Sequence, residues 1–160
     1  MTTDVPLMQP SRPASDANET VLLDREFRAA SLSPLREAVL AAASAAGLSR
    51  DRSIEVMLAA HEVAANVVRH GSGHGRLRLR VTPRAVSCQV SDLPAGAGAG
   101  RGGPRQAGGP AIAPASWPAE HGHGLWLVRR TADQVQVTAG PAGSVVSMTF
   151  NLPATALPTA

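Results

Sequence analysis

Two polar side chains four residues apart, Glu62 and Asn66, are the strongest candidates for chemistry in this sequence. Their segment is apolar at helical spacing, so both lie on one helix face, one turn apart, at the border of the apolar stripe. A carboxylate there can accept a proton from an attacking hydroxyl, and an amide oxygen can ligate a hard cation such as Mg²⁺. An ordinary helix-edge pair would have the same spacing. The expected stripe is Ile54, Met57, Leu58, His61, Ala64, Ala65 and Val68.

The adjacent His61 and Glu62 do not form a zinc-protease motif. That motif needs a second His four residues after the first, and residue 65 is Ala. His61 falls in the middle of the apolar stripe, so we expect a packed core histidine. The other histidines lie in Gly-rich loops, where we expect solvated side chains: His70, His74, His121 and His123.

A second candidate is Asp92, at the end of a strand-like segment. Val86, Cys88 and Val90 alternate with polar residues, and this period of two places Asp92 on the same face as the valines. A carboxylate on a covered face needs hydrogen-bond donors, which the backbone, solvent or a ligand such as the exocyclic amine of adenine could supply. A capping Asp between strand and turn is the alternative.

A third candidate is the run Gly-His-Gly-Leu at 122–125, which opens a short helix. Glycines at a helix N-terminus let the backbone approach an anion and direct free N–H groups toward it. One such motif is weak evidence by itself, because many turns contain one.

The elements that must position these residues follow from caps and periodicity. Ser33 and Pro34 predict the start of a first helix, and Gly47 predicts its end. Consecutive strands with short turns predict a largely antiparallel sheet with helices on one face. We expect helices at about 34–46, 51–69 and 124–131, and strands at about 20–27, 76–82, 86–92, 134–138 and 144–150.

The 160 residues predict one domain at about 20–152, flanked by flexible tails at 1–19 and 153–160. Within it, about 93–121 is a loop rich in Gly and Pro. All 15 basic residues are Arg, which excludes a Walker A lysine and other lysine-dependent sites. Alternation at Arg76, Arg78 and Arg80, followed by Arg84, predicts a solvated strand face. Few aromatic residues are available to stack bases, which argues against a nucleic-acid surface.

The single cysteine, Cys88, excludes an internal disulfide and fits a reducing compartment. No signal peptide or membrane-spanning segment is evident in the sequence. We therefore expect a cytoplasmic protein with no membrane partner.

The order of these motifs resembles the GHKL ATP-binding superfamily, and within it the small anti-sigma-factor serine kinases. Three segments carry the resemblance: 61–71 (HEVAANVVRHG), 90–96 (VSDLPAG) and 122–130 (GHGLWLVRR). The resemblance implies an α+β two-layer sandwich of the Bergerat type, in which the Gly/Pro-rich loop is the ATP lid. It also implies ATP and Mg²⁺ as cofactors.

The same resemblance implies a role for each motif. Glu62 would be the general base, Asn66 would hold the Mg²⁺ that bridges the ATP phosphates, and Asp92 would pair with the adenine amine. The remaining nucleotide-binding residues would come from the glycine motifs that shape the adenine pocket and close the lid: Gly96, Gly122, Gly124 and Leu125.

The chain departs from the family pattern at two positions. Pro94 stands where the first glycine box has Gly, and the position of a last-strand Thr that helps to hold adenine matches Val145, with Ser144 as the nearest hydroxyl. These departures favour a rival function, a non-catalytic nucleotide-gated binding module, whereas Glu62 favours a kinase. A histidine kinase catalytic domain lacks support because no dimerising hairpin precedes the domain.

The predicted function is an ATP-dependent serine/threonine kinase. By resemblance its partners would be a STAS-type anti-sigma-factor antagonist, which it phosphorylates, and a sigma factor, which it sequesters. Members of this branch are often dimers, so a homodimer is also an expectation. A simple ATPase is less in keeping with so short a chain.

Overall fold

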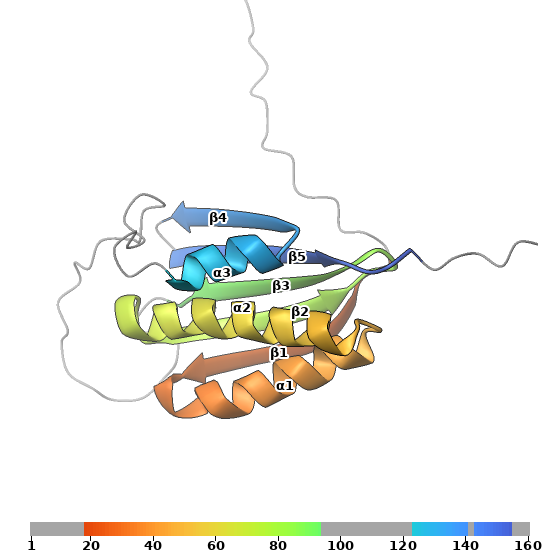
Figure 1. Ribbon diagram of the computed structural model, residues 1–160. Coiled ribbons are helices and arrows are strands. Elements are labelled where there is room, and N and C mark those ends of the chain that lie inside the picture. The colour runs from red at the N-terminus through yellow and green to blue at the C-terminus, as the bar shows by residue number, and fades with distance from the viewer. Residues whose placement is uncertain (1–17, 94–122, 141–142, 155–160) are drawn as a thin grey trace, which may run out of the picture.

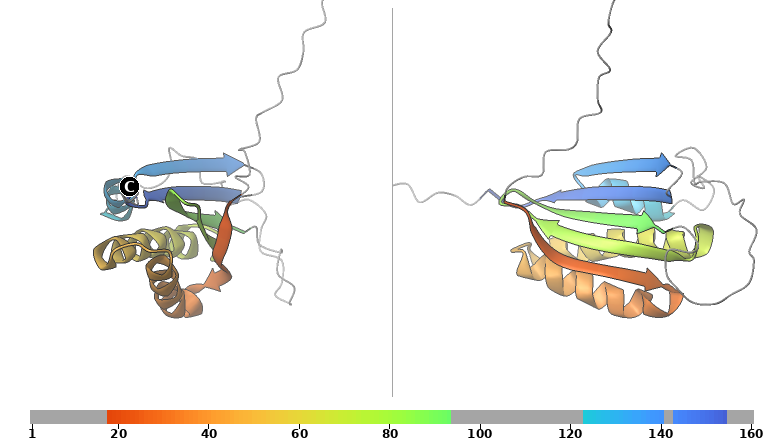
Figure 2. Two further views of the ribbon diagram at one scale, coloured as in Figure 1. Left: turned by 90° about the vertical axis from the view of Figure 1, so that its right-hand side faces the viewer. Right: turned by 180° about the vertical axis from the view of Figure 1, so that it is seen from behind.

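A computed structural model of the chain describes residues 18–93, 123–140 and 143–154, which form a sheet layer and a helix layer (Figure 1). The three α-helices cover one face of the sheet and leave the other face open (Figure 2). This confirms the predicted α+β two-layer sandwich. The elements in chain order are β1 Thr20–Arg28, a 3-10 turn Ala29–Ser31, α1 Leu32–Ala45, α2 Arg50–His70, β2 His74–Val81, β3 Ala85–Asp92, α3 His123–Thr131, β4 Gln134–Gly140 and β5 Gly143–Asn151.

The described sheet has five strands in the order β1-β2-β3-β5-β4, and every neighbouring pair is antiparallel. In the register of β2 and β3, Gly75 lies opposite Asp92 and Leu77 opposite Val90. In the register of β3 and β5, Ser91 lies opposite Val145. These registers decide which residues share the helix-covered face near the end of β3.

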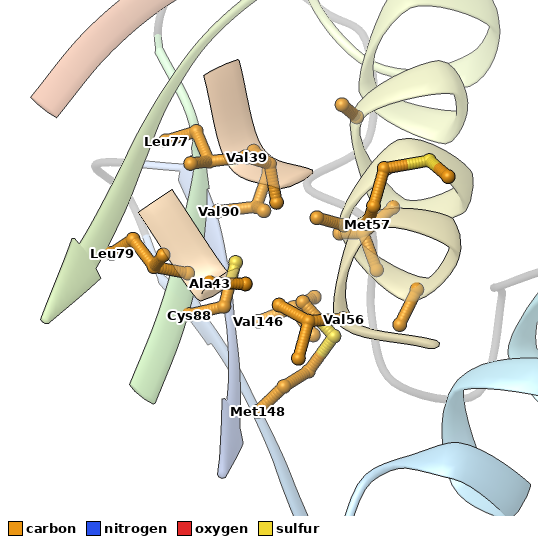
Figure 3. Close-up of a cluster of buried hydrophobic side chains, with 14 of the residues drawn as sticks. Val39, Ala43, Val56, Met57, Leu77, Leu79, Cys88, Val90, Val146 and Met148 are labelled. Atoms are coloured by element: carbon orange, nitrogen blue, oxygen red, sulfur yellow. The ribbon is translucent and has the colours of Figure 1, made fainter. Parts of the chain in front are cut away.

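The core lies between the sheet and the helices, and the side chains on the helix-covered face of the strands fill much of it (Figure 3). Every second residue of β2, β3 and β5 is buried, except at the last residues of β2 and β3, and the residues between them are half-buried on the open face. Removing such a side chain from water contributes roughly 1.5–3 kcal/mol. The buried hydrophobic residues of these three strands are Leu77, Leu79, Val86, Cys88, Val90, Val146, Met148 and Phe150.

The first helix starts earlier than Ser33 and Pro34 predict. It begins at Leu32, and Ser31 closes the preceding turn: its hydroxyl accepts the Arg28 N–H at 2.9 Å and donates to the Arg28 carbonyl at 3.1 Å. The predicted end is confirmed, because Gly47 has φ +90°, a left-handed conformation that suits glycine after a helix.

The buried face of α2 is centred differently from the predicted stripe. Val56, Ala60, Val63 and Val67 are buried against the sheet, whereas Ile54, Leu58, His61 and Val68 are half-buried on one flank. The prediction of a mid-stripe core histidine is therefore wrong: His61 lies at the side of the helix. The prediction gave more weight to the larger Ile54 and Leu58 and to His61 than to the valines that face the sheet.

The open face of β2 is a neutralised ionic surface. Asp24 of β1 binds Arg76 (Nε–Oδ1 2.6 Å) and Arg78 (Nε–Oδ2 3.0 Å), and Glu19 binds Arg80. The predicted solvated face is thus confirmed, and most of its positive charge is paired.

Residues 1–17, 94–122 and 155–160, which include most of the predicted lid at about 93–121, lie outside the described part of the chain. The expectations for the two tails, for the lid and for Pro94, Gly96 and Gly122 therefore remain predictions. No helix among the described residues is long and apolar enough to cross a membrane.

Candidate functional site

Arg52 fixes the third helix against the second. Its guanidinium donates to the Thr131 carbonyl at the end of α3 and to Asp133 just beyond it, and it also binds Glu55 at 2.6 Å. The same group lies 5.3 Å from the centre of the Phe150 ring. The first turn of α2 is thereby joined to the last turn of α3, so the two neighbouring helices run antiparallel (Figure 1).

This anchor determines where α3 begins. A helix rises about 1.5 Å per residue, so α3 extends about 12 Å back from Thr131. Along α2, the same distance from Arg52 reaches Ala60. The first turn of α3, with its N–H groups that have no partner within the helix, therefore lies beside the C-terminal half of α2. Figure 1 shows both of these helix ends on the same side of the molecule.

Asn66 lies on the α3 side of α2. Arg52, Ala59 and Asn66 are spaced by seven residues, which is close to two helical turns, so they follow one flank. Arg52 shows that this flank faces α3. Because α3 begins near the level of Ala60, Asn66 lies about 9 Å further along α2, ahead of the N-terminus of α3.

Glu62 and Asn66 are both half-buried, as their position beside the apolar stripe predicts. Neither side chain forms a hydrogen bond with another residue in the described ranges. A half-buried carboxylate and a half-buried amide with free acceptor oxygens can receive a proton and a hard cation, respectively.

His61 is on the opposite flank of α2, toward α1. Burial lowers its pKa below the ordinary value of 6.5, and the positive charges of Arg36 and Arg69 lower it further. Its Nδ1 is buried without a hydrogen-bond partner in the described chain. We infer that His61 is neutral near pH 7 and does not share the face of Asn66.

Asp92 lies on the helix-covered face, as the strand alternation predicts, and it closes against the end of α2. Its carboxylate accepts the Ser72 N–H at 3.2 Å (Oδ1) and 3.3 Å (Oδ2), and also the Ser72 hydroxyl. Its Oδ2 lies so close to Gly71 that residue 71 has no room for a Cβ. The end of β3 and the C-terminus of α2 therefore form one corner of the site.

The last strand places a different residue on this face than the family pattern predicts. Val145 lies opposite Ser91 on the open face, so the match to Val145 is wrong. Ser144 precedes it on the helix-covered face and is only 5% exposed. Continued by one residue, the register of β3 and β5 places Ser144 opposite Asp92. The hydroxyl expected near the adenine aspartate is thus present, one residue earlier.

The remaining candidates are described in part or not at all. Gly124 and Leu125 lie in the first turn of α3, which places their backbone at the N-terminus beside α2. Gly96 and Gly122 lie outside the described residues. Sequence reasoning missed Ser72, which lies at this end of the fold, and Arg52, which anchors α3 at the other end of α2. Ser144 was noted only as the nearest hydroxyl, although the alternation traced backward from Val146 would have placed it on this face.

No group of three or more His, Cys, Asp or Glu residues in the described ranges could hold a metal ion. This does not suit a metal held only by protein side chains. It does suit Mg²⁺ bound with a nucleotide, because that ion takes few protein ligands and completes its coordination with phosphate oxygens and water. The free amide of Asn66 ahead of α3 fits this requirement.

A family model described as the histidine kinase-like ATPase domain matches residues 26–150. The chain belongs to this family. The match covers every element from the end of β1 to β5, and it supports the GHKL-type superfamily predicted from the motifs. Among curated proteins, none matches the sequence significantly.

Membership in the histidine kinase-like ATPase family implies that the chain binds ATP and carries out kinase-type or ATPase-type chemistry. The three motifs predicted for the nucleotide, on α2, at the end of β3 and at the start of α3, come together at one end of the sandwich (Figure 1).

Proposed function

We propose that this chain is an ATP-dependent serine/threonine protein kinase of the anti-sigma-factor type. Its substrate would be a serine on a small STAS-type anti-sigma-factor antagonist, and its second partner would be a sigma factor. The observation that carries the proposal is the pair on α2: Glu62, half-buried and without a hydrogen bond in the described ranges, lies one turn before Asn66, which is ahead of α3.

The reaction follows from these groups. The serine hydroxyl of the antagonist attacks the γ-phosphorus of ATP, a new O–P bond forms, and the bond to the β-phosphate oxygen breaks to release ADP. Glu62 accepts the hydroxyl proton, so the products are phosphoserine, ADP and a protonated Glu62. A positioned base of this kind contributes typically ~10²–10⁴-fold.

The other residues bind and orient the nucleotide. Asp92 accepts a hydrogen bond from the adenine amino group, and the backbone N–H groups at the start of α3 face the phosphates. Asn66 would hold Mg²⁺, which supplies charge neutralisation during phosphoryl transfer. Because sigma factors act on transcription inside the cell, a cytoplasmic location belongs to the same proposal, as does a homodimer.

A non-catalytic switch that uses ATP only to change partners is the main rival. Val145 no longer supports it, because Ser144 provides the hydroxyl on the helix-covered face. Glu62 distinguishes the two functions, because a switch needs no base beside Asn66.

The test is to incubate the purified chain with γ-labelled ATP, Mg²⁺ and a panel of STAS-domain antagonists. The proposal expects acid-stable label on a serine of at least one antagonist. Bound ATP without transfer to any antagonist would favour the switch, and acid-labile label on histidine would favour a histidine kinase. Either of these results would contradict the proposal.

A further inference from the structure

The turn after α2 holds the Asp92 carboxylate through one residue, Ser72. The Ser72 N–H donates to both carboxylate oxygens, at 3.2 Å to Oδ1 and 3.3 Å to Oδ2, and the hydroxyl contacts Oδ1. The same hydroxyl oxygen accepts the His74 N–H at 3.2 Å and lies 2.8 Å from the His74 carbonyl. Ser72 therefore connects the end of α2, the start of β2 and the end of β3.

A serine hydroxyl has one proton, so Ser72 can donate either to Asp92 or to the His74 carbonyl, not to both. A charged acceptor makes the stronger hydrogen bond, which favours donation to Asp92. Oδ1 then accepts two hydrogen bonds, one from the Ser72 hydroxyl and one from the Ser72 N–H. Oδ2 accepts only the longer hydrogen bond from the same N–H. Oδ2 receives the weaker hydrogen bonding, and because one side of it lies against Gly71, another donor must approach it from the side away from that glycine.

We propose that Ser72 is a positioning residue that determines base specificity, because it occupies Oδ1 and leaves Oδ2 to accept the amino group of the base. This inference rests on the proposed nucleotide site at Asp92, but not on kinase activity. Adenine presents an amino group that can donate a hydrogen bond to Oδ2. Guanine presents a carbonyl oxygen at the same place, so two hydrogen-bond acceptors would face each other.

The orientation of the carboxylate matters because guanine has two adjacent N–H donors beside its carbonyl. A carboxylate that is free to turn can accept both of them with its two oxygens. With Oδ1 held by Ser72, this two-point pairing is blocked, and adenine is favoured. Removal of the hydroxyl should therefore weaken ATP binding and relieve the exclusion of GTP.

The experiment measures the affinities of the full chain for Mg-ATP and Mg-GTP by calorimetry in four proteins: wild type, Ser72→Ala, Ser72→Thr and Ser87→Ala. Ser72→Ala should bind ATP about tenfold more weakly, the loss typical of one hydrogen bond to a charged group, with GTP binding unchanged or stronger. Ser72→Thr retains the hydroxyl and should recover the wild-type preference. Ser87 lies on the open face at the other end of β3 and serves as the matched control.

An unchanged ratio of ATP to GTP affinity in Ser72→Ala would overturn the inference alone. If both affinities fell equally and the melting temperature fell as well, the role of Ser72 would be structural only. A wild-type chain that binds neither nucleotide, or both equally, would overturn the Asp92 site and this inference together.

Discussion

Asp92 at the end of β3 lies directly against Gly71, the residue that ends α2. A Cβ at position 71 would overlap Oδ2 of Asp92 and would also crowd the Val67 carbonyl. Glycine is required here because of this close approach between helix and strand. The contact keeps Asp92 beside α2, the helix that carries Glu62 and Asn66.

Gly71→Ala should therefore displace the Asp92 carboxylate. We expect a loss of about 1–3 kcal/mol in the free energy of unfolding, as for other overpacked sites, together with weaker ATP binding. Urea denaturation of Gly71→Ala, Asp92→Ala and the double variant measures the coupling. Additive losses in the double variant would show that the two residues do not interact.

Glu62→Gln tests the role of the base. Because the amide has nearly the shape of the carboxylate but cannot accept the proton, ATP affinity should be retained and phosphoryl transfer should fall by ~10²–10⁴-fold. Glu37→Gln on the exposed face of α1 is the matched control and should transfer phosphate at the wild-type rate. Equal rates in the two variants would remove Glu62 from the mechanism.

Arg52→Ala tests the anchor of α3. The variant loses contacts to Thr131, Asp133 and the Phe150 ring. We expect the free energy of unfolding to fall by about 2 kcal/mol, since hydrogen bonds to charged groups are worth more than neutral ones. Arg50→Ala, which changes an exposed residue of the same turn, should have little effect. If the two variants had the same stability, Arg52 would not be the anchor.

The Asp24 carboxyl should titrate at low pH. Hydrogen bonding to Arg76, aided by Arg78, lowers its pKa from 3.8 to about 2. Because the folded-state pKa is depressed, the stability from this group is complete above pH 3.8 and is lost as the pH falls toward 2. Carboxyl NMR titration should show a higher midpoint in Arg76→Gln and no change in Arg84→Gln. An unchanged midpoint in Arg76→Gln would show that the ion pair is absent in solution.

Patterns of period two and glycine stops predicted the parts of the site that lie within one element. Alternation placed Asp92 on the covered face, and Gly71 marked the end of α2. The same alternation, traced backward from Val146, would have placed Ser144 rather than Val145 beside Asp92. Local patterns were sufficient for these residues because their positions depend only on backbone geometry.

Contacts between distant segments could not be predicted in this way. The contact between Ser72 and Asp92 joins a turn to a strand end, and that of Arg52 with Asp133 joins the first turn of α2 to the segment after α3. Neither residue interrupts a pattern, so sequence alone gives no signal for it. The flank of α2 that faces α3, and with it the position of Asn66, became evident only through Arg52.

The most direct test of the central claim is calorimetry of ATP binding to the wild type and to Asn66→Ala, each with and without Mg²⁺, with Gln136→Ala on the exposed side of β4 as control. We expect the wild type and Gln136→Ala to bind ATP more tightly with Mg²⁺, and Asn66→Ala to remain folded but to lose this gain, because the amide oxygen no longer holds the ion. The same ATP affinity with and without Asn66, or with and without Mg²⁺, would contradict the assignment of this site.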